Sequence, residues 1–261
     1  SAGEMVVEPL YLRALGGRAG QLVTVLFNTL FCVIFRRTDV VLFFASGPCL
    51  MSIITKLFGI PSIACIRGVD SRRGKFSKIE KMLLMLGEKS AISVASVCTV
   101  NSIEMKKYFE SKGGRPMYIP NGANYPNTGD EAVLSKYGLN PDGYILFAAR
   151  LDPSKNLHDL LEAHSKIDDD LRAPLMVCGG SPHGSEYMQS LEAMASSDVV
   201  FSGHLPHFEL DPLMRNCSIF VLPSSVEGMS NSLLAAMSAS RCVLCSDIDA
   251  NADVLDHCDD A

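Results

Sequence analysis

The sequence lacks an apolar run long enough to cross a lipid bilayer. Its longest apolar run lies near Leu22–Phe35 and is interrupted by Asn28. Arg36 and Arg37 follow it directly. Because a spanning helix needs roughly 20 apolar residues, we expect this stretch to form a core helix or a helix on a membrane surface.

An excess of basic charge is also lacking. The formal net charge is −6 at pH 7, which argues against a nucleic-acid partner because the phosphate backbone selects basic surfaces. Basic residues do gather between Arg67 and Lys78. This local cluster favours a smaller polyanionic ligand.

The nine cysteines show no spacing typical of a disulfide framework or a zinc site. The Cys-x-x-Cys pair Cys242 and Cys245 falls in a predicted strand, where residues three apart point to opposite faces. We therefore expect no metal at this pair. Scattered thiols are typical of a reducing compartment and predict a cytoplasmic protein.

What the sequence does contain is a regular alternation of strands and helices. At 48% hydrophobic and 20% charged residues, it can bury a substantial core. Short apolar runs predict strands in the second half at "YILFAA", "PLMVCGG", "VVFSG", "SIFVLP" and "CVLCSD". Helical periodicity lies between them. Continuous apolar strands joined by helices indicate a parallel, doubly wound, Rossmann-like sheet.

The first half repeats this α/β scheme more loosely, with strands at "DVVLFF", "SIACI", "SVCTV" and "PMYIPNG" and a long helix over Lys78–Ser93. The stretch Ala123–Gly143 is polar and rich in turn residues. We therefore predict two Rossmann-like domains, 1–122 and 123–261, with an interdomain cleft between them.

Candidate site residues follow the predicted strands, because ligands of open α/β sheets bind beyond the carboxyl ends of strands. Arg150 and Lys155 flank a turn set by Pro153 and could clamp a diphosphate. The alternative is a solvated loop with two ordinary charges. In the first half, the loop after "SIACI" could line the cleft or be a solvated basic loop; its candidate residues are Arg67, Gly68, Asp70, Arg72 and Arg73.

A second candidate is the stretch "SSVEGMSNSLLAAMSAS". Ser230 is a good helix N-cap, so the first amides of the next helix would be available to an anion. Glu227 is better suited to accept hydrogen bonds from sugar hydroxyls, unless it is only an exposed surface acid. Ala235 lies one helical turn beyond Asn231, where a glutamate would also reach the pocket; the alternative is a helix-favouring small residue packed on the sheet.

Two weaker signals involve "FSGHLP" and His164. Gly203 would let the backbone approach a flat ligand, and His204 or Leu205 could lie beside a base, although an ordinary strand-to-helix turn is the alternative. His164 lies on an apolar helix face and is expected to be a core histidine.

Taken together, six stretches resemble the donor domain of family 4 retaining glycosyltransferases, which have the GT-B fold. They are "YIPNGA", "FAARLDPSKNLHDLLEAH", "VCGG", "FSGHLP", "IFVLPSSVEGMSNSLLAAMS" and "CVLCSDI". The resemblance implies transfer of a sugar from a nucleotide-diphosphate sugar to a glycan or lipid-linked acceptor, without metal or cofactor. It also allows a peripheral association with the inner face of a membrane.

The same resemblance assigns roles to individual residues. It implies that Arg150 and Lys155 bind the donor diphosphate and that Glu227 holds the sugar. The turn that would contact sugar and phosphate consists of Gly228, Met229, Ser230, Asn231 and Ser232.

Two positions depart from the family pattern. Ala235 replaces the second glutamate, which typically holds the ribose, and Arg67 replaces a histidine of the first-domain loop. Segments expected at both ends of the family fold are missing, so the chain is expected to be a fragment. The alternative function is a catalytically impaired GT-B subunit that binds a nucleotide sugar or a protein partner.

Overall fold

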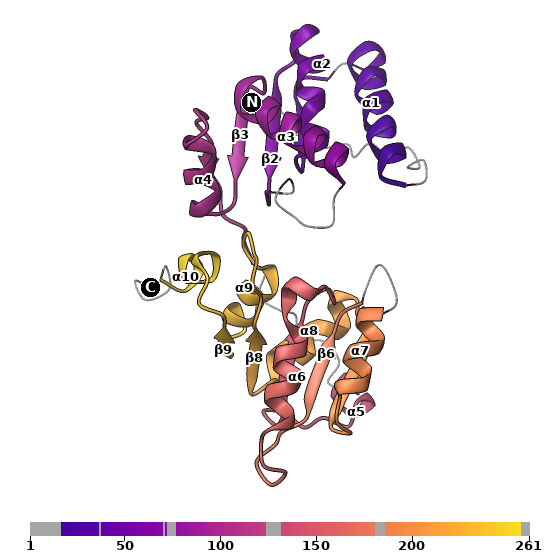
Figure 1. Cartoon of the computed structure of the whole chain (residues 1–261), viewed down its shortest axis with the longest axis vertical. Coiled ribbons are helices and arrows are strands. Elements are labelled where there is room, and N and C mark those ends of the chain that lie inside the picture. Colours follow the sequence, from indigo (N-terminus) through magenta and orange to yellow (C-terminus); the bar gives the residue numbers. More distant parts are fainter. Residues whose placement is uncertain are drawn as a thin grey trace, which may run out of the picture. The chain divides into compact units, whose positions relative to one another are not determined.

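The protein is described from a computed structural model, shown in Figure 1. The structure describes residues 17–36, 38–69, 71, 77–123, 132–180 and 186–256. The chain divides into two compact units, Ser1–Pro120 and Asn121–Ala261, whereas the sequence places the boundary after Gly122. Each unit contains a parallel sheet.

The described part of the first unit carries a sheet in the order β1-β2-β3-β4 with every neighbouring pair parallel. Its elements are α1 Gly17–Phe35, β1 Val41–Phe44, η1 Pro48–Met51, α2 Ser52–Leu57, β2 Ser62–Ile66, α3 Lys78–Ser93, β3 Val97–Val100, α4 Ile103–Glu110 and β4 Met117–Tyr118. A core of buried apolar residues from the strands, η1, α3 and α4 holds the unit together.

Helix α3 shows how the sequence fixes an element boundary. The side chain of Ser77 accepts a hydrogen bond from the Glu80 N–H at 3.3 Å, and the Glu80 carboxylate accepts one from the Ser77 N–H at 2.8 Å. This reciprocal capping box satisfies two amides at a helix start. The helix therefore begins at Lys78, as predicted.

The second unit contains a sheet whose strand order reveals where its ligand site should be. Its elements are α5 Ala132–Lys136, β5 Ile145–Ala148, η3 Pro153–Lys155, α6 Leu157–Ser165, β6 Leu175–Cys178, α7 Glu186–Met194, β7 Val199–Gly203, α8 His207–Asn216, β8 Ile219–Leu222, α9 Asn231–Ser238, β9 Cys242–Cys245 and α10 Asp249–Leu255. The described strands run parallel in the order β7-β6-β5-β8-β9. The order reverses between β5 and β8, which makes this pair the topological switch point.

Both faces of this sheet are covered by helices. In β5, Leu146 packs into a core shared with α8 and α9, while Phe147 packs into a core shared with α6 and α7. Successive strand residues point to opposite faces, so continuous burial requires helices on both sides. The doubly wound arrangement that the apolar strands predict is confirmed for this unit.

Local differences from the sequence prediction are confined to short elements. The last strand of the first unit, β4, is limited to Met117–Tyr118, and α5 lies within the stretch expected to consist of turns. Leu134 of α5 is 3% exposed and belongs to the core, which explains why a short helix forms there. Across the described ranges, no helix is both long and apolar enough to traverse a membrane.

Candidate functional site

The loop after β5 is a short, rigid turn that presents Lys155. Asp152 caps η3, since its Oδ1 accepts hydrogen bonds from the Ser154 N–H at 3.1 Å and from Ser154 Oγ at 2.7 Å. Asn156 then adopts a left-handed conformation with φ of 50°, which reverses the chain into α6. Lys155 is thereby held at the carboxyl end of β5, beside the switch point.

The loop after β8 ends at the start of α9, as the sequence predicts. Ser230 is the N-cap, and its side chain accepts a hydrogen bond from the Leu233 N–H at 3.4 Å. Among the described residues, no acceptor faces the backbone N–H groups of Asn231 and Ser232. These amides and the helix dipole make this end of α9 favourable for an anion.

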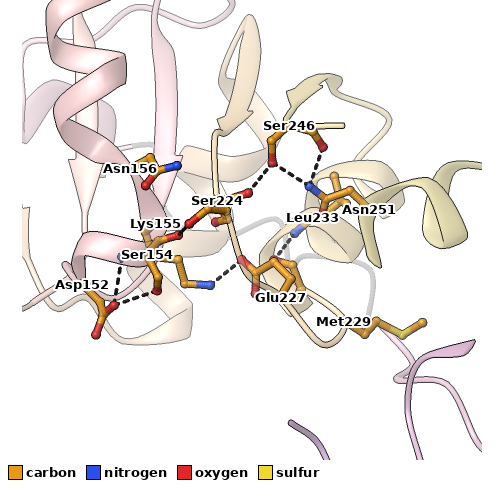
Figure 2. A network of polar contacts seen from close by, with 12 residues as sticks. Asp152, Ser154, Lys155, Asn156, Ser224, Glu227, Met229, Leu233, Ser246 and Asn251 are labelled. Carbon is orange, nitrogen blue, oxygen red and sulfur yellow. Dashed lines mark hydrogen bonds and ion pairs between the residues drawn. The ribbon is translucent and has the colours of Figure 1, made fainter. Parts of the chain in front are cut away.

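The two switch-point loops are bonded to each other (Figure 2). The Lys155 ammonium forms an ion pair and hydrogen bond with Glu227 Oε1. Asn156 Nδ2 donates to the Pro223 carbonyl at 3.0 Å, and the Ser225 N–H donates to the Ser154 carbonyl at 2.9 Å. These bonds fix the spacing between the loop that carries the cation and the loop that carries the carboxylate.

Burial distinguishes the Lys155–Glu227 pair from an ordinary surface ion pair. The Lys155 and Glu227 side chains are 13% and 9% exposed, whereas those of the Lys166–Glu162 pair are 69% and 60% exposed. Exposed pairs contribute little because water screens them, while partly buried charges are strongly attracted to any ligand charge of opposite sign. Glu227 is therefore not an exposed surface acid.

A third loop supports the same site from the β9 side. Ser246 Oγ donates a hydrogen bond to the carbonyl of Ser224, as Figure 2 shows. Asn251 of α10 is 1% exposed, and its Nδ2 donates to the Ser246 carbonyl at 3.0 Å and to Ser246 Oγ at 3.3 Å. These polar contacts hold the stretch that leads to Glu227.

Arg150 is not part of this bonded cluster. It lies two residues beyond the end of β5, and its side chain is exposed. Within the described ranges, its guanidinium has no hydrogen-bond or ion-pair partner. The structure thus brings Lys155 to Glu227 but does not bring Arg150 into contact with either, so the two-cation clamp stays a prediction.

The ends of β6 and β7 come close together at two glycines. The Gly179 N–H donates to the Gly203 carbonyl at 2.8 Å, and a Cβ at Gly179 would lie 1.8 Å from the Ala149 carbonyl oxygen. Only glycine fits so close an approach. Gly203 has φ of 70°; after it, His204 is exposed and Leu205 is half-buried against the core.

Ala235 and His164 both lie where the sequence places them. Ala235 is on α9 and half-buried against the core of the second unit, and its methyl group offers no acceptor for a hydroxyl. His164 is 1% exposed, and its Nε2 lies 2.8 Å from the Ala173 carbonyl. The expectation of a core histidine is confirmed.

The described residues of the first unit include part of the basic loop. Arg67 is exposed, and its guanidinium lies 5.6 Å from the ring centroid of Phe44, which is within cation–π range. Gly68 follows it and is half-buried. Three further candidates lie outside the described residues: Asp70, Arg72 and Arg73.

Sequence reasoning missed a buried carboxylate that anchors this loop. Glu88 of α3 is 3% exposed and accepts hydrogen bonds from the Ser71 N–H at 3.3 Å, from Ser71 Oγ at 3.0 Å and from Ser46 Oγ at 3.4 Å. It thereby links the segments after β1 and β2. The available signal was an acid directly after a glycine in the helix. A Cβ at Gly87 would lie 1.9 Å from the Ser46 carbonyl oxygen, so α3 passes close to the loop after β1 at this point.

The buried cysteines are structural side chains. Burial raises the pKa of the Cys178 thiol at the end of β6 to about 11 and that of Cys217 to about 12. Thiols with such values stay protonated at neutral pH and behave as small hydrophobic groups. In the part of the chain that the structure describes, no group of three or more His, Cys, Asp or Glu side chains could hold a metal ion.

Comparisons with known proteins indicate the family to which the second unit is similar. A family model described as "Glycosyl transferases group 1" matches residues 132–260. The chain is 30% identical over 120 residues to O-antigen chain mannosyltransferase B of Escherichia coli, covering 44% of this chain and 32% of that protein. It is 24% identical over 212 residues to a Campylobacter jejuni enzyme, N-acetylgalactosamine-N,N'-diacetylbacillosaminyl-diphospho-undecaprenol 4-alpha-N-acetylgalactosaminyltransferase, covering 78% of this chain and 56% of that one.

A solved structure extends the likeness over both units. The Anabaena protein Alr3699/HepE, crystallised in complex with UDP-glucose, superposes with a TM-score of 0.75 at 17% identity, covering 90% of this chain and 65% of that chain. This likeness confirms the GT-B fold class. The chain spans about a third to just over half of the length of the two curated relatives.

Proposed function

Residues 132–260 of this chain form a domain of the glycosyl transferases group 1 family, and on that premise we propose that the protein transfers a sugar from a nucleotide-diphosphate sugar to a glycan or lipid-linked acceptor. We further propose that the transfer retains the anomeric configuration. The observation that carries the proposal is the largely buried ion pair of Lys155 and Glu227 at the switch point, beside the amino end of α9.

In this proposal the donor diphosphate replaces Glu227 as the partner of Lys155. Arg150 supplies a second cation from the same sheet edge, and the N–H groups of Asn231 and Ser232 donate to phosphate oxygens. Charge that develops on the leaving phosphate is then stabilised by groups already in position, which is the main source of rate enhancement in such a site. Glu227, released from Lys155, accepts hydrogen bonds from sugar hydroxyls.

The nucleotide base and the acceptor are assigned to segments that follow strands of the two sheets. The base would lie against the bare backbone of Gly203, with His204 and Leu205 beside it, because β6 is the neighbour of β5 and Gly179 at its end is bonded to Gly203. The loop that starts with Arg67 and Gly68 would contribute to the acceptor side. The proposed chemistry requires no metal, since cations of the chain carry the phosphate charge.

The acceptor class is proposed from the relatives and from one surface. The Campylobacter jejuni relative is named for a diphospho-undecaprenol acceptor. Helix α1 exposes a stripe of large apolar side chains at helical spacing, namely Val23, Phe27, Phe31, Ile34 and Phe35. Such a stripe suits the surface of a membrane, so a cytoplasmic protein that touches the inner leaflet would meet a lipid-linked acceptor there.

The proposal is tested by offering the whole protein a panel of nucleotide sugars with soluble and lipid-linked glycan acceptors. We expect release of nucleoside diphosphate together with a glycosylated product, whose anomeric configuration NMR would show to match the donor's. Sedimentation with vesicles would test the membrane contact. Binding of a nucleotide sugar without turnover on any acceptor would favour the rival function, a catalytically impaired binding subunit. Ala235 and Arg67, which depart from the family pattern, support that rival.

Restoring a glutamate at Ala235 is a sharper test of that rival. Ala235→Glu should lower KM for the donor about five- to ten-fold, because a ribose hydroxyl would gain a charged acceptor worth roughly 1–1.5 kcal/mol at this partly exposed position. Steady-state kinetics with the preferred donor would measure it. Ala163→Glu, the same change on the exposed face of α6, is the control. An unchanged or higher KM would mean that position 235 does not reach the ribose.

A further inference from the structure

Asn121, the first residue of the second unit, is bonded to the turn that precedes α9. Its Nδ2 donates a hydrogen bond to Asn231 Oδ1 at 2.9 Å and to the Met229 carbonyl at 3.3 Å. Its backbone N–H lies 3.1 Å from Met229 Sδ. The two side-chain bonds join positions 108 and 110 apart in the sequence, so they belong to the tertiary structure and not to a local turn.

These bonds matter because of which atoms they engage. The start of α9 is rich in donors, with unpartnered N–H groups at Asn231 and Ser232 among the described residues. The Met229 carbonyl and Asn231 Oδ1 are acceptors at the same place, and a free acceptor lone pair repels an anion. Asn121 occupies both of these acceptors with one amide group.

We propose that Asn121 is a positioning residue for the donor diphosphate: it engages two acceptor oxygens at the start of α9, so that neither leaves its lone pair free to repel the anion. The inference rests on the proposed function, because it assigns a diphosphate to this turn. It goes further in naming a residue outside the site, at the connection from the first unit, that sets the affinity of the turn for an anion.

Three variants separate charge from hydrogen bonding. Asn121→Ala removes both side-chain bonds, and Asn121→Asp keeps the side-chain shape but replaces the donor with a carboxylate facing two acceptors. We expect affinity for inorganic pyrophosphate, UDP and GDP, measured by calorimetry on the whole protein, to fall about five-fold in the first and about thirty-fold or more in the second. Gly122→Ala is the control, because a Cβ there meets nothing within 4 Å, and we expect less than a two-fold change.

A double-mutant cycle distinguishes loss of the Asn121–Asn231 hydrogen bond from loss of folding. Asn231→Ala removes one of the two acceptor oxygens, on an exposed side chain, so Asn121→Ala should cost less affinity in the Asn231→Ala background than in the wild type if the bond acts as proposed. An equal cost of Asn121→Ala in both backgrounds, or equal binding by Asn121→Asp and the wild type, would overturn the inference. A wild-type protein that binds none of the three probes would instead overturn the proposed function itself.

Discussion

Lys155→Ala is expected to weaken binding of nucleoside diphosphates at least about ten-fold and to lower the rate of sugar transfer about a hundred-fold or more. A charge-assisted hydrogen bond is worth about 1.5–3 kcal/mol, and a group that stabilises charge on the leaving phosphate contributes about as much again in the transition state. Calorimetry with UDP and GDP would measure the first effect, and initial rates with a nucleotide sugar the second.

The matched control for this variant is Lys166→Ala. Lys166, directly after α6, also pairs with a glutamate, Glu162, at 2.7 Å, but both side chains are exposed. Removing that pair should change binding and transfer less than two-fold, because screened ion pairs contribute little. Equal affinity of the Lys155→Ala variant and the Lys166→Ala control would remove Lys155 from the donor site.

Folding must be checked in the Lys155 variant. Glu227 is 9% exposed, and removing its cation leaves a carboxylate that is largely desolvated and uncompensated, which is destabilising. A lower melting temperature is therefore expected. Binding should be measured well below the melting transition, where circular dichroism shows the wild-type spectrum.

Most of the fold could be predicted because its signals are local. The start of α3 follows from a capping box between residues three apart, and the strands of the second unit follow from short apolar runs. The helix α5 was missed because its apolar stretch, Ala132–Leu134, is too short to show a period and lies within a polar segment. Tertiary packing of Leu134 decides its structure.

The site could be predicted only where one loop carries its own signal. Lys155 and Glu227 each follow an apolar strand, and their strands are neighbours in the sheet because of the switch in strand order. Asn121 and Glu88 act through bonds to distant loops, and no periodicity or motif reports such a bond. The asparagine was visible in the sequence only as part of a turn signal, and the glutamate only as an acid on a helix.

The Lys155–Glu227 pair also predicts that one variant binds phosphate ligands more tightly than the wild type, whereas Lys155→Ala binds them more weakly. Glu227→Gln should bind UDP and inorganic pyrophosphate about three- to ten-fold more tightly than the wild type, because it removes a negative charge beside the bound phosphate and releases Lys155 from a competing partner. The same variant should transfer sugar about a hundred-fold more slowly, because the sugar hydroxyls lose a charged acceptor in the transition state.

The opposing signs make Glu227→Gln the most discriminating change in the site. A general loss of structure would weaken binding and transfer together, and a residue remote from the donor would alter neither. The control is Glu162→Gln, which neutralises the exposed partner of Lys166 and should leave both quantities unchanged. Weaker binding of pyrophosphate by Glu227→Gln would mean that Glu227 supports the phosphate site only by holding Lys155. The proposal that the diphosphate replaces Glu227 as the partner of Lys155 would then be wrong. A cation that binds phosphate must bind it more tightly when the carboxylate that competes for it is neutralised.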